Sequence, residues 1–113
     1  METVAVILFA IAAVGGLTLA SMHLRSRMPN LPLALVHGLF AAAGLIVLLI
    51  AVIQASSFGS AGVALIIFLV AALGGFTLIS MHLRGKTLST PLVLGHGALA
   101  VVAFLVLLIG LAA

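Results

Sequence analysis

The 113-residue sequence contains no cysteine and no tryptophan, and Glu2 is its only acidic residue beside four lysines and arginines. Without cysteine the chain cannot form disulfides, thiolate metal sites or the covalent attachment of a c-type haem. Charged residues make up 4% of the sequence and apolar residues 66%. These are too few polar side chains to cover a water-soluble domain of this size. We therefore expect lipid to surround most of the molecule.

The scarcity of carboxylates argues against several classes of function. Mg²⁺ and Ca²⁺ prefer oxygen ligands, and hydrolytic metal sites and proton-coupled exporters usually include an acidic residue. Ser21 and Ser80 likewise have no acidic partner to orient a base for nucleophilic catalysis. The sequence pI of about 11.7 does not indicate nucleic-acid binding, because the four cations form no basic stripe and no aromatic platform accompanies them.

Four apolar segments are long enough to cross a bilayer, whose hydrocarbon core of about 30 Å needs about 20 helical residues. The segments are Val4–Met22, Leu33–Ile53, Ala61–Met81 and Leu92–Leu111. The cations follow the first and third segments, whereas Gln54–Ser60 is uncharged. Since short positively charged loops stay in the cytoplasm, we predict that loops 25–30 and 84–90 are cytoplasmic. Both termini would then lie outside, most simply across a bacterial inner membrane.

The sequence is one motif written twice. Residues 4–53 align with residues 63–112 at an offset of 59, and positions 15–50 share 19 of 36 residues with positions 74–109. The most specific identities are Gly15-Gly16 with Gly74-Gly75, Thr18 with Thr77, Ser21–Arg25 with Ser80–Arg84, Pro32 with Pro91, and His37-Gly38 with His96-Gly97. Two helices per repeat give both repeats the same orientation, related by a pseudo-twofold axis along the membrane normal. The predicted fold is all-α: one transmembrane four-helix bundle over residues 1–113, built from two tandem, same-orientation helical hairpins.

Each predicted helix carries one histidine. The four are His23, His37, His82 and His96. In each hairpin the two histidines lie seven residues on either side of the expected turn, centred at Asn30 and at Ser89. Residues equidistant from a turn lie at similar depth, so we expect one layer of histidines near the cytoplasmic face. Because an imidazole without a partner is unfavourable in lipid, these histidines are candidates for a functional site.

Neutral imidazoles on facing helices, with small residues and cations nearby, suit a six-coordinate b-type haem. We expect the four histidines to ligate iron. The candidates for cofactor contacts are the cations Arg25, Arg27, Arg84 and Lys86, expected at the propionates, and the small residues Gly16, Gly38, Ala41, Gly44, Gly75, Gly97 and Ala100, expected beside the macrocycle. Since both repeats keep both histidines, we favour two haems held by off-axis pairs. A single haem on the pseudo-twofold axis would use one symmetry-related pair.

In its apolar, histidine-bearing helices the chain resembles the membrane-anchored bis-histidine b-type cytochromes. The resemblance implies an electron carrier whose partner is a quinone in the bilayer or a redox protein. It does not extend to the group's common pattern of two histidines on one helix, because each helix here carries one. The chain also lacks the substrate domain and nucleotide fingerprint of a complete redox enzyme.

Two other functions are compatible with the sequence. Met22 and Met81 are adjacent to His23 and His82, and imidazole with thioether suits Cu(I). Adjacent helical residues point about 100° apart, however, which favours a packing role for the methionines. In a non-catalytic membrane subunit, the histidines would instead form hydrogen bonds between helices or contact a quinone.

Overall fold

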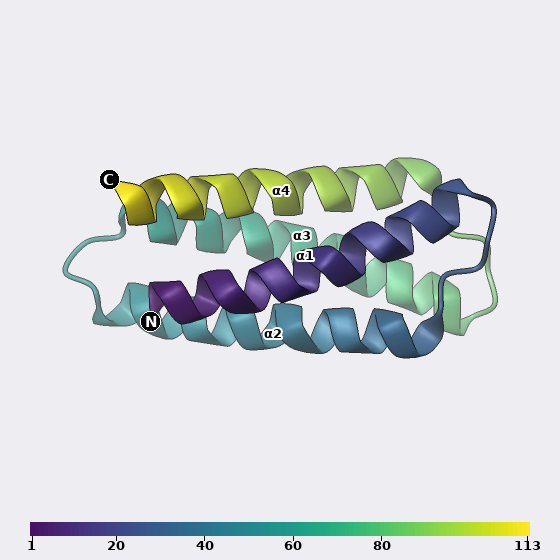
Figure 1. Cartoon of the computed structure of the whole chain (residues 1–113), viewed down its shortest axis with the longest axis horizontal. Helices are drawn as coiled ribbons and strands as arrows, with labels where there is room; N and C mark the ends of the chain where they lie inside the picture. The colour runs from purple at the N-terminus through teal and green to yellow at the C-terminus, as the bar shows by residue number, and fades with distance from the viewer.

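The computed structural model of the protein describes all 113 residues and contains four helices and no strand (Figure 1). The helices are α1 (Glu2–Leu24), α2 (Leu31–Gln54), α3 (Gly59–Leu83) and α4 (Thr90–Ala112). They pack as a bundle, which confirms the predicted all-α fold. Each helix is long and apolar enough to cross a membrane, and the bundle is 45 Å long and 20 × 19 Å wide. These are the properties of an integral membrane protein.

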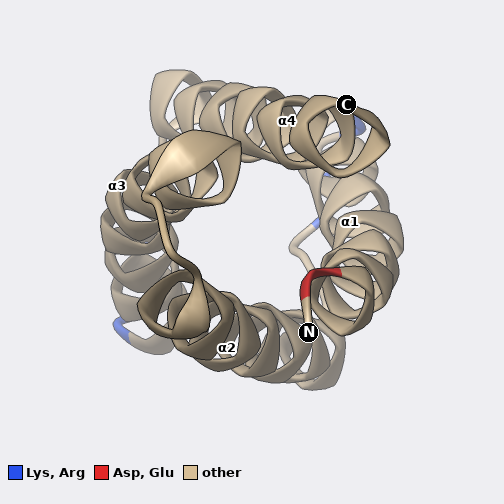
Figure 2. Ribbon diagram, turned by 90° about the vertical axis from the view of Figure 1, so that its left-hand side faces the viewer, with Lys and Arg blue, Asp and Glu red and all other residues tan.

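The helices form a ring in chain order, in which each hairpin packs more extensively within itself than against the other hairpin (Figure 2). Pairs α1–α2 and α3–α4 make the large interfaces, whereas α1–α4 and α2–α3 close the ring with smaller ones. Both hairpin turns lie at one end, which we call the basic end because it carries all four lysines and arginines. The two chain termini and the α2–α3 connection lie at the opposite end, which we call the terminal end (Figure 1).

Side chains just before α2 and α4 determine where these helices begin. The backbone N–H of Leu33 donates to Asn30 Oδ1 at 3.0 Å, and the N–H of Leu92 donates to Ser89 Oγ at 3.3 Å. Each cap satisfies a backbone donor that the helix itself cannot pair. A proline follows in the first turn of both helices, where its missing N–H costs no hydrogen bond.

Helices α1 and α3 end in the same way, on a residue in the left-handed region. Ser26 has φ 62°, and Gly85, its equivalent in the second repeat, has φ 68°. The backbone N–H of Arg27 donates to the carbonyl of Met22, which is the bond that defines a Schellman motif. Glycine adopts this conformation freely, but a serine side chain makes it less favourable. The two turns therefore share one geometry, but the turn at Gly85 is intrinsically more stable than the turn at Ser26.

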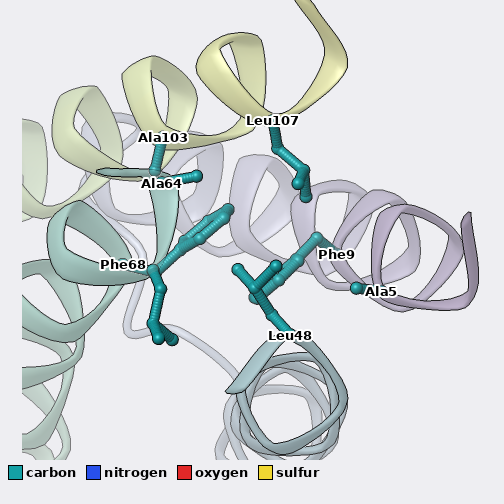
Figure 3. Close-up of a cluster of buried hydrophobic side chains, with 8 residues drawn as sticks. Ala5, Phe9, Leu48, Ala64, Phe68, Ala103 and Leu107 are labelled. Carbon is teal, nitrogen blue, oxygen red and sulfur yellow. The ribbon is translucent and has the colours of Figure 1, made fainter. Parts of the chain in front are cut away.

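The apolar core fills the half of the bundle nearest the terminal end. Its buried side chains are Ala5, Phe9, Leu48, Ala64, Leu65, Phe68, Ala103 and Leu107. The rings of Phe9 and Phe68, which occupy equivalent positions in the two repeats, stack with centroids 3.8 Å apart (Figure 3). Leu48 and Leu107, also equivalent, are completely buried beside them. The packing thus follows the internal repeat, and the histidines lie toward the basic end from this core.

Candidate functional site: a histidine pair between the hairpins

The four histidines lie at two depths. His23 is one residue from the end of α1 at Leu24, whereas His37 is six residues beyond the start of α2 at Leu31. His37 packs against Gly15, eight residues before His23 on α1, so at about 1.5 Å per residue it lies about 12 Å deeper in the bundle. The second hairpin repeats this arrangement. The single layer predicted from the sequence is therefore wrong, because Asn30 caps α2 and is not the centre of the turn.

We call His37 and His96 the inner histidines. One ring nitrogen of each contacts a backbone carbonyl on the other helix of its own hairpin. Nδ1 of His37 lies 2.6 Å from the carbonyl oxygen of Ala12, and Nδ1 of His96 lies 2.7 Å from that of Ala71. A carbonyl can only accept, so Nδ1 is the donor in both cases. The neutral ring then carries its lone pair on Nε2, which bonds to no protein group. Both rings therefore present a free ligand nitrogen in a fixed tautomer.

Glycines in the partner helices make these anchors sterically feasible. A Cβ atom on Gly16 would lie 2.9 Å from Cε1 of His37, and one on Gly75 would lie 3.1 Å from Cε1 of His96. A larger residue at Gly16 would force the ring of His37 to shift, whereas at Gly75 the contact with His96 would be tight. The space beside Gly16 and Gly75, which the sequence predicts to admit a macrocycle, is thus filled by imidazoles.

The inner histidines face each other across the two hairpins. Their ring centroids are 6.2 Å apart and their planes are nearly perpendicular, at 89°. Two imidazoles that bind one metal ion from opposite sides, each with its nitrogen about 2 Å from the metal, have centroids about 6 Å apart. One ligand would come from each repeat, as expected for a single site on the pseudo-twofold axis.

The outer histidines, His23 and His82, differ from each other. Nε2 of His23 lies 2.9 Å from the hydroxyl of Thr90 at the start of α4, so this contact joins the two hairpins. The equivalent of Thr90 in the first repeat is Leu31, which offers no hydroxyl to His82. No group of three or more histidine or acidic side chains is close enough to share a metal ion. The one pair of histidine rings found in contact is His37 with His96.

The remaining small residues of the predicted site lie in different surroundings. A Cβ atom on Gly44 would lie 3.0 Å from the ring of Phe9, so that ring fills the space. Added Cβ atoms on Gly38 and Gly97 would meet nothing within 4 Å. Ala41 and Ala100 are half-buried. The Cβ positions of Gly38, Gly44 and Gly97 are thus not closed by an imidazole as those of Gly16 and Gly75 are.

The four cations are exposed at the basic end, with no carboxylate near them. Arg25 and Arg27 line a groove of about 340 Å³ along α1, together with Leu17, Thr18, Ser21 and Met22. The groove contains no histidine. Met22 lines this groove without a histidine beside it in the lining.

Sequence reasoning missed three partners of the histidines: the carbonyls of Ala12 and Ala71 and the hydroxyl of Thr90. The repeated Gly-Gly pair was a usable signal for the carbonyls, because glycine allows a side chain from a neighbouring helix to approach the backbone. Thr90 gave no such signal, because it occurs in only one of the two repeats.

Fold and site together define a polytopic membrane four-helix bundle with a symmetric, part-buried imidazole pair between its hairpins. No family model, no curated protein and no solved structure matches the chain.

Proposed function

We propose that the protein is a small integral-membrane electron carrier that binds one b-type haem between His37 and His96. The observation that carries the proposal is the pair itself, with Nδ1 of each ring bound to a backbone carbonyl and Nε2 of each ring free. Histidines that ligate metals usually donate their second ring nitrogen to a carbonyl or carboxylate in this way. A b-type haem held by two such rings would supply reversible one-electron transfer.

The donor set fits axial ligation, whereas the space for a macrocycle depends on the contact between the hairpins. His37 and His96 belong to different hairpins, and the interfaces between hairpins are the smaller ones in the bundle. The anchors to Ala12 and Ala71 each lie within one hairpin. The anchors thus hold both rings within their own hairpins, at the 6.2 Å centroid spacing that suits one metal ion. This single pair favours one haem over the two expected from sequence.

The charges suggest how the carrier is oriented and what it contacts. We place the basic end in the cytoplasm, because short positively charged loops are retained on that side, in a bacterial inner membrane. Arg25, Arg27, Arg84 and Lys86 lie at the end of the bundle nearer the histidines and are the candidates to bind propionates. Electrons would be exchanged with a quinone in the bilayer or with a redox protein on the cytoplasmic side.

A second candidate function follows from the same hydrogen bonds. His37, His96 and His23 each connect two helices, which is what histidines in a purely structural membrane subunit would do. Interhelical hydrogen bonds of this kind contribute about 0.6 to 2 kcal/mol in membrane proteins. This function requires no cofactor, so it predicts a colourless protein without iron or copper.

Pyridine haemochrome assays of purified variants distinguish the two functions. We expect the unsubstituted protein to contain haem, and we expect His37→Leu and His96→Leu each to lose it. His82→Leu is the matched control. It also removes one imidazole from an apolar stretch of helix, but His82 makes no ring contact with another histidine. Retention of haem by both inner variants, or its loss from the control alone, would contradict the proposal. A protein that contains no haem and takes up no added haemin supports the structural function.

A further inference from the structure

We infer that the groove along α1 at the basic end binds the headgroup of an anionic phospholipid. The groove has a volume of about 340 Å³ and is lined by Leu17, Thr18, Ser21, Met22, Arg25 and Arg27. These residues belong to the last two turns of α1 and the turn that follows, where the helix leaves the apolar part of the bundle. No histidine lines the groove, although Arg25 and Arg27 are also among the candidates for the propionates.

The charge of the groove is positive and has no counterion within the protein. Arg25 and Arg27 are both exposed, and the only acidic side chain, Glu2, lies at the opposite end of α1. Figure 2 shows this separation, with the acidic residue near the viewer and the cations at the far end. Two guanidinium groups can bind a phosphate through paired, charge-assisted hydrogen bonds. The groove is therefore suited to an anionic ligand.

The hydroxyl groups of the groove have different roles. Thr18 donates its proton to the carbonyl of Val14 at 2.8 Å, so it has none to offer a phosphate. Ser21 makes no side-chain hydrogen bond within the protein, so its hydroxyl is free to donate. Ser21 and the two arginines together supply donors to a phosphate from both the helix and the turn.

The apolar part of the groove favours a lipid over free phosphate. Leu17 is 68% exposed and Val14, one turn earlier on the same face of α1, is 69% exposed. In a membrane these side chains contact acyl chains. The groove thus passes from apolar side chains through hydroxyls to arginines in the direction in which a phospholipid passes from its chains to its phosphate.

The second hairpin provides an internal comparison. At the positions equivalent to Leu17 and Arg27 it has Phe76 and Lys86. The aromatic ring of Phe76 is larger than the leucine side chain, and the single ammonium of Lys86 replaces the planar guanidinium of Arg27. General attraction to an anionic membrane acts on both pairs of cations alike. Specific binding should depend on Arg25 and Arg27 more than on Arg84 and Lys86.

Native mass spectrometry of the full chain, with phosphatidylglycerol, phosphatidylcholine or inorganic phosphate added in detergent, tests the inference. We expect phosphatidylglycerol to bind more tightly than phosphatidylcholine and inorganic phosphate not to displace it. The double variant Arg25→Gln/Arg27→Gln should weaken phosphatidylglycerol binding more than about tenfold, the loss expected for two charge-assisted contacts. The matched variant Arg84→Gln/Lys86→Gln should weaken it less than about threefold.

A third variant keeps the test independent of membrane insertion, which also depends on these cations. Arg25→Lys/Arg27→Lys retains both charges but loses the donor forks, and we expect it to bind phosphatidylglycerol more weakly than the unsubstituted chain. Equal losses in the two glutamine variants would show general attraction to anionic lipid and overturn the inference. Displacement of the lipid by inorganic phosphate, or equal binding of phosphatidylcholine, would also overturn it.

Discussion

Replacing Gly16 with alanine tests the contact on which the inner site depends. The added Cβ would lie 2.9 Å from Cε1 of His37 and 3.3 Å from its Nδ1, so the ring must move away from the Ala12 carbonyl. Loss of the hydrogen bond costs about 1 kcal/mol and forced overpacking costs about 1 to 3 kcal/mol. Alanine is about 1 kcal/mol better than glycine within a helix. The net expectation is a loss of about 1 to 3 kcal/mol.

Gly38→Ala is the matched control for this substitution. Gly38 is also within a helix, but its added Cβ would meet nothing within 4 Å. Only the helix propensity then changes, so we expect a gain of up to about 1 kcal/mol. The two variants should therefore differ by about 1 to 4 kcal/mol, with opposite signs relative to the unsubstituted chain.

Reversible unfolding of the purified protein in mixed detergent micelles, followed by circular dichroism, measures both free energies of unfolding. Gly75→Ala, whose Cβ would lie 3.1 Å from the ring of His96, should lose less stability than Gly16→Ala. The reasoning is refuted if Gly16→Ala and Gly38→Ala shift the free energy of unfolding in the same direction by similar amounts.

Three further predictions use the same unfolding assay. Ser26→Gly should raise the free energy of unfolding by about 0.5 to 1 kcal/mol, because it relieves a non-glycine residue at φ 62°; no gain would contradict this account of the turn. His23→Leu should destabilise the bundle by about 1 kcal/mol more than His82→Leu, since only His23 bonds to the other hairpin; equal effects would contradict the asymmetry. Leu48→Ala should cost about 2 to 5 kcal/mol because the side chain is completely buried, and a loss below about 1 kcal/mol would contradict the packing of the core.

The fold was predictable because two independent features of the sequence agree. Apolar segments of bilayer length indicate helices, and the repeat at offset 59 indicates how the helices pair. The positions of the turns were less predictable. Asn30 and Ser89 are each a residue that favours both turns and helix N-caps, and each stands two residues before a proline. In the structure both act as caps, which moves each turn toward the preceding helix.

The candidate site was predictable only in part, for a physical reason. The sequence identified the histidines and Gly16 as polar or small residues kept in both repeats, but not the contact between them. Which residues meet across two helices depends on rotation about the helix axes and on depth, and an error of a few residues in the turn changes both. His37 was therefore expected at the depth of His23, whereas it lies about 12 Å deeper and faces His96.

The absorption spectrum of the detergent-purified, unsubstituted protein, oxidised and then reduced, with iron measured on the same sample, tests the central claim most directly. The account predicts a b-type haem spectrum with low-spin, six-coordinate bands and one iron per chain. A protein that has neither haem nor iron, and gains neither when haemin is supplied, would contradict it. Two irons per chain would contradict the single shared site between His37 and His96.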